Sequence, residues 1–203
     1  EKVGRVLIQA AYSMMEGEGA FAFINSTPYA TNQNLWISWM YTELEENPEK
    51  YKDMHFVGEF YGEDEYAVTE EVAKELFRVH SELEMIITPS AASMPAVGDV
   101  IEELGVAAKF TGLGLPSEMA DYIHTGSCPW MYLWNPIELG YLAAYAGAAI
   151  ENGEMTGAPE EQFLAGNQGY KYIQDAQDGG TEVVLANPLK FDAENVDMWK
   201  TVY

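Results

Sequence analysis

Residues 20–48 read AFAFINSTPYATNQNLWISWMYTELEENP and contain one complete strand, loop and helix. The apolar run at 20–24 is short and is followed by Asn-Ser-Thr-Pro, which predicts a buried strand that leads into a loop. A helix is predicted to begin near Asn34 and to end at Asn47-Pro48. Its apolar face is expected to carry Trp36, Met40 and Leu44.

The same alternation of strand and helix repeats on both sides of this unit. A preceding helix runs from Val3 to Met14 and ends at Gly17 and Gly19. Later strands are predicted at 55–61, 85–88, 108–113 and 130–134, with helices at 68–83, 94–104 and 119–123. The helix after residue 62 is expected to bury Val68, Val72, Leu76, Val79 and Leu83. Five alternations predict an α/β fold with a doubly wound parallel sheet.

The loops after the strands are the candidate functional region, because parallel sheets bind ligands outside the carboxyl ends of their strands. These loops are 26–33, 62–66, 89–93, 113–117 and 134–136. Their neutral polar and aromatic side chains are Thr31, Asn32, Gln33, Asn34, Ser90, Ser93, Trp134 and Asn135. Amides, hydroxyls and flat apolar faces suit a neutral polyhydroxylated ligand. Each residue taken alone is as typical of helix capping or core packing as of ligand binding.

The final third of the chain has a different character. A helix rich in small residues follows Asn135-Pro136, and a Gly-rich polar stretch runs from 152 to 180 with Phe163-Leu164 inside it. A last strand is predicted at 183–185. One helix and one strand are too little for a core, so we expect this region to dock onto another structure.

Charge limits the classes of partner. The chain has 203 residues with 33 Asp and Glu against 10 Lys and Arg, a formal net charge of −23. This field disfavours binding to nucleic acids and to anionic membranes, so we expect neither partner. It fits either a protein that works in high salt or, more commonly, an ordinary solvated acidic surface.

The pattern of reactive residues argues against metal and thiol chemistry. The single cysteine, Cys128, excludes an internal disulfide and is expected to be a buried inert thiol. The three histidines lie far apart in the sequence without ligand spacing, so no metal ion is expected. Asp64 and its acidic neighbours lack the pattern of a calcium loop, and we expect a solvated helix start there.

Motifs for cofactors and enzymes are also missing. The glycine pairs at 17–19 and 112–114 lack the third glycine of a dinucleotide-binding loop, and no Walker loop or Gly-x-Ser-x-Gly elbow occurs. We therefore expect no cofactor and no enzymatic activity. No apolar run reaches the ~20 residues that span a bilayer, and we expect any signal segment to lie outside this chain.

Five segments occur in the order and spacing of a known family. They are 28–36 (PYATNQNLW), 87–90 (ITPS), 111–119 (TGLGLPSEM), 133–141 (LWNPIELGY) and 191–196 (FDAENV). Together they resemble the type I solute-binding proteins of bacterial ABC sugar importers, and the rhamnose-binding and autoinducer-2-binding branch is the most similar. The resemblance covers nearly the whole chain, so it is more specific than any single motif.

This resemblance implies a protein of two α/β lobes that clamps a ligand between them and delivers it to a membrane permease. Residues 1–135 would form the C-terminal lobe. Residues 136–203 would return to an N-terminal lobe, absent from this chain, and include a final crossover strand. That missing lobe or a second copy would cover the helix at 136–150. The expected location is extracytoplasmic, in the periplasm or on the cell surface.

The resemblance also implies site residues. Autoinducer-2 binders place an Asp-Gln pair where this chain has Asn32-Gln33, and they make contacts at the positions of Pro89 and Ala91. An amide at position 32 can donate a hydrogen bond where a carboxylate only accepts, so a deoxysugar such as rhamnose is as well supported as autoinducer-2.

Four further residues complete this set. Ser90 and Gly114 stand where sugar binders of the wider family often have Asn and Asp, and Trp134 and Asn135 would lie at the hinge side. The expected function is binding of a small neutral sugar-like ligand. The effector domain of a sugar-responsive transcription regulator and an enzyme on a Rossmann-like sheet remain alternatives, and the net charge of −23 disfavours the first of these.

Overall fold

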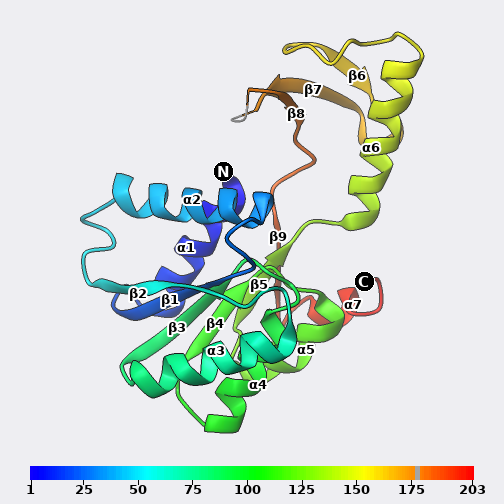
Figure 1. Cartoon of the computed structure of the whole chain (residues 1–203). Helices are drawn as coiled ribbons and strands as arrows, with labels where there is room; N and C mark the ends of the chain where they lie inside the picture. Colours follow the sequence, from blue (N-terminus) through cyan, green and yellow to red (C-terminus); the bar gives the residue numbers. More distant parts are fainter. Residues whose placement is uncertain (177–178) are drawn as a thin grey trace. The chain divides into compact units, whose positions relative to one another are not determined.

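The computed structural model describes residues 1–176 and 179–203 (Figure 1). The chain divides into two compact units. Unit 1 contains Glu1–Leu133 together with Pro188–Tyr203, and unit 2 contains Trp134–Asn187. Each unit has its own strands and its own buried side chains.

Unit 1 is built on a four-stranded parallel sheet in the order β2-β1-β3-β4. Its strands are β1 (Gly19–Asn25), β2 (Met54–Tyr61), β3 (Leu83–Thr88) and β4 (Lys109–Gly112). β1 and β3 occupy the centre and are buried along nearly their whole length, which explains their almost continuous apolar sequences. The four strands predicted from these runs are confirmed.

Helices cover both faces of this sheet. They are α1 (Lys2–Met14), α2 (Thr31–Glu46), α3 (Tyr66–Val79), α4 (Met94–Leu104) and α5 (Pro116–Thr125). α1 and α2 lie on one face, and α3, α4 and α5 lie on the other (Figure 1). The predicted doubly wound α/β fold is confirmed. Because β2 and β3 flank β1 on opposite sides, the switch point of the sheet lies between β1 and β3.

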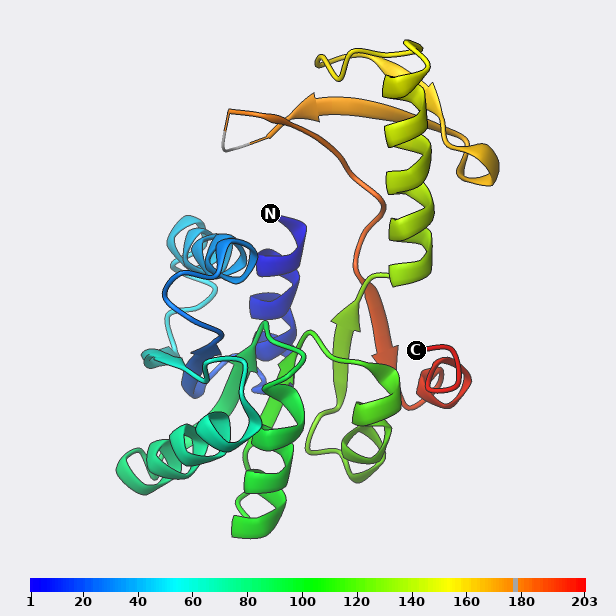
Figure 2. The ribbon, with the colours of Figure 1, turned by 45° about the vertical axis from the view of Figure 1, so that its right-hand side comes forward.

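The fifth predicted strand does not extend this sheet, which corrects our expectation. β5 (Trp130–Leu133) meets the end of β4 only through a parallel bridge between Leu113 and Tyr132. Its ladder partner is the antiparallel strand β9 (Leu189–Asp192), which lies beside it in both views (Figure 1, Figure 2). The short helix α7 (Val196–Trp199) follows β9. Local periodicity could not reveal this pairing, because the partner comes from the far end of the chain.

The apolar faces of two helices agree only in part with those predicted. Met40 of α2 and Leu76 of α3 are buried as predicted, but Val79 at the end of α3 is 54% exposed. α2 begins at Thr31 rather than near Asn34. Polar residues that hydrophobicity cannot predict are also buried, because they have hydrogen-bond partners inside the fold, as Thr69 has in Ser93 at 3.0 Å. Leu83, expected on the helical stripe, is the first residue of β3. The buried residues are Ile37, Met40 and Glu43 in α2, and Thr69, Ala73 and Leu76 in α3.

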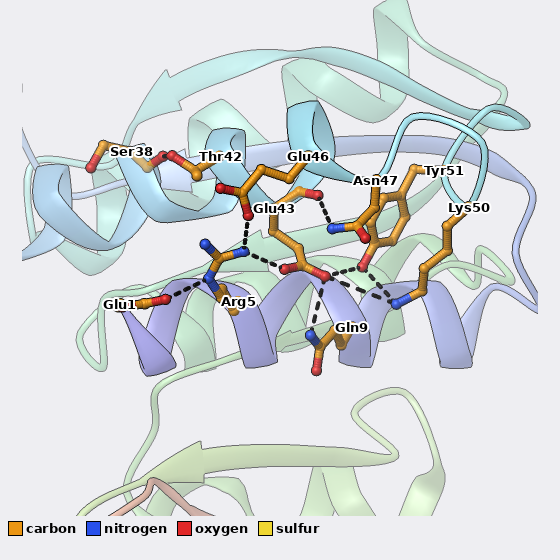
Figure 3. A network of polar contacts seen from close by, with 10 residues as sticks. All are labelled: Glu1, Arg5, Gln9, Ser38, Thr42, Glu43, Glu46, Asn47, Lys50 and Tyr51. Carbon is orange, nitrogen blue, oxygen red and sulfur yellow. Dashed lines mark hydrogen bonds and ion pairs between the residues drawn. The ribbon is translucent and has the colours of Figure 1, made fainter.

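Glu43 is a carboxylate in the interface between α1 and α2 and is only 4% exposed (Figure 3). It accepts hydrogen bonds from Arg5 Nη1 at 2.8 Å, Gln9 Nε2 at 3.1 Å and Tyr51 Oη at 2.8 Å. Burial alone would raise the pKa of Glu43, but these hydrogen bonds and the Arg5 charge outweigh it and lower the pKa. The two helices are therefore joined by a buried ionised group.

Unit 2 pairs one helix with a small antiparallel sheet. α6 (Pro136–Glu151) precedes β6 (Gln162–Leu164), the single 3₁₀ turn Gly166–Gln168, β7 (Tyr170–Asp175) and β8 (Thr181–Val183). The sheet order is β6-β7-β8. Its buried side chains are Leu142, Ala149, Met155, Phe163, Ala165 and Ile173.

This cluster corrects the expectation that the final third cannot form a core. Two of its three strands were missed because they lie in a Gly-rich polar stretch. Gly166 and Gly169 have φ of 52° and 74°, values that glycine adopts freely, and they form the tight connection between β6 and β7. The last predicted strand is also shifted, from 183–185 to 181–183.

The structure also shows the state of the cysteine, of clustered metal-ligand residues and of long apolar helices. Cys128 is buried, and burial raises the pKa of its thiol, as expected for an inert cysteine. Within the described residues, no group of three or more His, Cys, Asp or Glu side chains is arranged to hold a metal ion. In the same part of the chain no helix has the length and apolar character needed to cross a membrane.

Candidate ligand-binding site

The carboxyl edge of the unit 1 sheet brings together the loops after β1, β2 and β3. Ser26 follows β1 and Ser90 follows β3, so they stand on the two sides of the switch point. Asp64 lies on the loop after β2. In sheets of this kind the switch point is where ligands bind.

One carboxylate connects these three loops. The hydroxyl of Ser26 donates to Asp64 Oδ2, and the hydroxyl of Ser90 donates to Asp64 Oδ1 at 2.6 Å. Ser26 and Ser90 are buried, whereas Asp64 is exposed. Because β1 lies between β2 and β3, Asp64 reaches across the end of β1 to meet Ser90. We call these residues, Ser26, Asp64 and Ser90, the switch-point trio.

Asp64 was missed as a site residue. The sequence predicts a solvated helix start there, and α3 does begin at Tyr66, but the carboxylate is held by two serine hydroxyls. Its loop was among the candidate loops. No local pattern singles out Asp64, since its partners lie 38 and 26 residues away in the chain.

The loop after β1 is held from inside by Asn25. Its side-chain amide nitrogen donates to Asn34 Oδ1 at 2.7 Å and to Glu59 Oε1 at 2.8 Å, and its Oδ1 accepts from the Ser26 backbone at 2.8 Å. Asn34 in turn donates to the carbonyl of Pro28 at 2.9 Å. Asn34 therefore helps to fix the conformation of the loop after β1. Asn25 positions this loop as well, a role that the sequence did not predict.

Asn32 and Gln33 lie in the first turn of α2, directly beyond this loop. Asn32 is exposed and Gln33 is half-buried. Among the described residues neither side-chain amide has a hydrogen-bond partner. Both amides are thus available to hydrogen-bond a ligand.

The loop after β3 contributes Pro89, Ser90 and Ala91. Pro89 and Ser90 are buried and Ala91 is half-buried. Ser90 presents its hydroxyl to Asp64, and its backbone N–H lies 3.4 Å from Thr88 Oγ1. The structure thus places these three residues at the same sheet edge as Asn32 and Gln33.

Gly114 lies beyond β4 and is closely packed. A Cβ atom at this position would lie 2.7 Å from Met131 Sδ and 2.9 Å from Met119 Cγ. Its backbone N–H donates to the Tyr132 carbonyl at 3.2 Å. Only a backbone contact with a ligand is possible here, because no side chain fits without repacking.

Trp134 and Asn135 belong to unit 2. Asn135 caps α6, because its Oδ1 accepts from the backbone N–H groups of Ile137 at 3.0 Å and Glu138 at 3.3 Å. Trp134 is half-buried. Capping, one of the two roles that the sequence left open for Asn135, is therefore present.

Two cavities of unit 1 differ in position. A cavity of about 240 Å³ lies beside the loop after β1 and is lined by Pro28, Asn34, Ile37, Ser38, Tyr41, Glu59 and Tyr61. A larger one of about 510 Å³, lined by acidic residues such as Glu18, Asp53 and Glu84, lies at the amino ends of the strands. Parallel sheets do not bind ligands at that end, so the carboxyl edge remains the candidate site.

Comparison with known families agrees with this architecture. A family model described as periplasmic binding protein domain matches residues 1–155. The chain belongs to the periplasmic binding protein family. Its parallel sheet and flanking helices are those of a type I periplasmic binding protein, as the sequence segments had indicated.

Solved structures similar to this periplasmic binding protein are longer. An ABC transporter solute-binding protein from Clostridium phytofermentas with bound L-rhamnose is 38% identical with a TM-score of 0.93, and the match covers 100% of this chain and 65% of that one. A sugar ABC transporter protein from Actinomyces odontolyticus is 33% identical with a TM-score of 0.83, and the match covers 98% and 62%.

A more distant structure shares the fold. LsrB from Clostridium saccharobutylicum in complex with AI-2 is 18% identical with a TM-score of 0.83, and the match covers 97% of this chain and 66% of LsrB. This periplasmic binding protein chain thus spans about two thirds of the length of the structures it matches.

Proposed function

We propose that this chain is part of an extracytoplasmic solute-binding protein of an ABC importer, which binds a small neutral sugar or sugar-like ligand and passes it to the permease. The observation that carries the proposal is the 38% identity, over 100% of this chain, to a solute-binding protein that holds L-rhamnose. A rhamnose-type deoxysugar is therefore the first ligand to test. Autoinducer-2, held by a protein of the same fold, is the second. The role is binding rather than catalysis.

The chemistry of the carboxyl edge supports a neutral polar ligand. We assign ligand contacts in unit 1 to the free amides of Asn32 and Gln33, to the loop after β3 and to the backbone of Gly114. Buried ligand hydroxyls need both donors and acceptors, and these groups supply both. In unit 2 we assign contacts to Trp134 and Asn135. The full proposed set is Asn32, Gln33, Pro89, Ser90, Ala91, Gly114, Trp134 and Asn135.

We further propose that the ligand is enclosed by two lobes. Residues 1–135 form the C-terminal lobe, and the segment from 136 onward belongs with a further N-terminal lobe before it crosses back. Exposed apolar side chains on α6 support this assignment, since Ile137 is 64% and Ile150 is 53% exposed. Surfaces of this kind are normally covered by another part of the protein or by a second copy.

Titration calorimetry of the natural full-length protein tests the ligand class. L-rhamnose, autoinducer-2 and a set of pentoses are the ligands. We expect binding of one neutral ligand, and we expect Gln33→Ala to weaken it about tenfold by removing a hydrogen bond. Gln174→Ala is the matched control, because Gln174 lies on β7 and pairs with Glu182 at 2.9 Å. Absence of binding to every sugar at millimolar concentration would contradict the proposed ligand class.

The residue at position 32 distinguishes the two leading ligands. The Asn32 amide donates hydrogen bonds, whereas the aspartate found there in autoinducer-2 binders only accepts them. We expect Asn32→Asp to lower the affinity for rhamnose and to raise the relative affinity for autoinducer-2. An unchanged ratio of the two dissociation constants would remove Asn32 from the proposed contacts.

A further inference from the structure

The switch-point trio places a carboxylate with unused acceptor capacity at the carboxyl edge of the sheet. Asp64 uses one lone pair of each carboxylate oxygen for Ser26 and Ser90. A carboxylate offers about four acceptor sites, so acceptor capacity remains on an exposed group. The serine hydroxyls, in contrast, are buried and directed toward Asp64.

The position of Asp64 is set by the topology of the sheet. Ser26 follows β1 and Ser90 follows β3, the two strands that flank the switch point. A carboxylate that contacts both must lie over the carboxyl edge at that point. This is the same edge that carries the amides of Asn32 and Gln33 and the loop at 89–91.

The backbone at Asp64 has a conformation that L-residues rarely adopt. Glu63 and Asp64 are consecutive non-glycine residues with φ of 57° and 55°, in the left-handed region. L-residues adopt this conformation at a cost in free energy, and strain of this kind is concentrated at functional sites. The loop accepts this cost while turning the carboxylate back over the end of the sheet.

From these observations we infer that Asp64 is a specificity-determining residue of the sugar site. Its carboxylate, held by Ser26 and Ser90, accepts hydrogen bonds from hydroxyls of a neutral ligand and repels ligands that carry a negative charge, such as hexuronates. This inference rests on the proposed function and names the class of ligand that the site rejects.

The variant Asp64→Asn tests this role in the full-length protein. The asparagine is isosteric, and a serine hydroxyl can rotate to accept from its amide, so the trio can stay connected. We expect the affinity for L-rhamnose to fall about tenfold or more, because a charge-assisted hydrogen bond becomes weaker. We also expect the ratio of rhamnose to D-galacturonate affinity to fall. A structural defect would lower both affinities together and leave that ratio unchanged.

Asp99→Asn is the matched control. Asp99 on α4 also accepts from two hydroxyls, those of Tyr66 and of Tyr122 at 2.6 Å, but its partners lie on the helices. We expect the ratio of its affinity for L-rhamnose to its affinity for D-galacturonate to equal that of the unaltered protein. A second variant, Ser26→Ala, keeps the charge of Asp64 and should retain the rejection of galacturonate.

The outcomes separate the inference from the proposed function. If the unaltered protein binds no neutral sugar, the proposed function fails before any variant is made. If it binds rhamnose and Asp64→Asn changes neither the affinity by more than twofold nor the ratio, only the inference fails. Should Asp64→Asn not fold, a crystal structure of the unaltered protein with L-rhamnose decides. We expect an Asp64 oxygen about 2.7 Å from a ligand hydroxyl, and a ligand that leaves Asp64 uncontacted would overturn the inference.

Discussion

The guanidinium of Arg5 donates a 2.8 Å hydrogen bond to the carboxylate of Glu43 across the interface between α1 and α2. The Glu43 side chain is 5% exposed and that of Arg5 is 22% exposed, so the carboxylate is the buried partner. A buried charge that loses its partner is far more costly than a surface charge. This pair therefore ties the two helices that cover one face of the unit 1 sheet.

Arg5→Ala should destabilise the protein by about 2–3 kcal/mol, because it removes the close cation of the Glu43 carboxylate and leaves only Lys50 at 4.0 Å. Urea unfolding at neutral pH measures the change. Arg78→Ala is the control, since Arg78 pairs with Glu75 on an exposed part of α3 and should unfold like the unaltered protein. Equal losses for the two variants would show that the Glu43 network adds nothing beyond a surface ion pair.

Acid sensitivity should depend on Glu43. Hydrogen bonds lower its pKa in the folded state, so its ionised form contributes stability above the unfolded value of about 4.3. That contribution is lost as the pH falls through the folded pKa. We expect Glu43→Gln to be less stable at pH 7 and to lose less stability between pH 5 and pH 3. Parallel stability curves for the two proteins over that range would rule out this role.

Two glycines at the carboxyl end of β4 should differ in their tolerance of alanine. A Cβ at Gly112 would lie 1.8 Å from the Thr88 backbone carbonyl, whereas at Gly114 the nearest atom, 2.7 Å away, is in the Met131 side chain. Methionine can move, but the backbone of β3 cannot. We expect Gly114→Ala to cost about 1–2 kcal/mol and Gly112→Ala about 3 kcal/mol or more by urea unfolding. The reverse order would contradict this packing argument.

Removal of the Asn135 cap should loosen the start of α6. Asn135→Ala leaves the N–H groups of Ile137 and Glu138 without a partner, and such a change costs about 1 kcal/mol. Hydrogen exchange of these two amides should accelerate about fivefold, while Asn135→Asp should keep the protection because aspartate also caps. Unchanged exchange in the alanine variant would show that the cap is not needed.

Local sequence patterns were sufficient for the four strands of the unit 1 sheet. Runs such as AFAFI and MIIT are apolar throughout because central parallel strands are buried on both faces. The same logic failed for β7, where alternate residues of a three-stranded sheet are exposed and the apolar residue Ile173 stands alone between polar neighbours. It also failed for Glu43, which is buried only because Arg5, Gln9 and Tyr51 supply its partners.

The sequence predicted which loops hold the candidate site residues, but it did not predict which side chains contact one another there. Asn32, Gln33 and the loop at 89–91 lie where the sequence places them, because the carboxyl ends of parallel strands share one edge. Asp64 was in a candidate loop without any sign of its partners. Asn135 showed a capping role that sequence alone could not separate from ligand binding.

The sequence by itself determined the order of strands and helices in unit 1, since that order depends on short-range patterns of apolar and turn residues. It also carried the five segments whose order and spacing resemble the family that the family model then matched. The tertiary structure alone decided the pairing of β5 with β9, the burial of Glu43 and the union of Ser26, Asp64 and Ser90. These contacts join residues far apart in the chain. Their formation depends on which strands become neighbours in the sheet, and that is settled only when the core assembles.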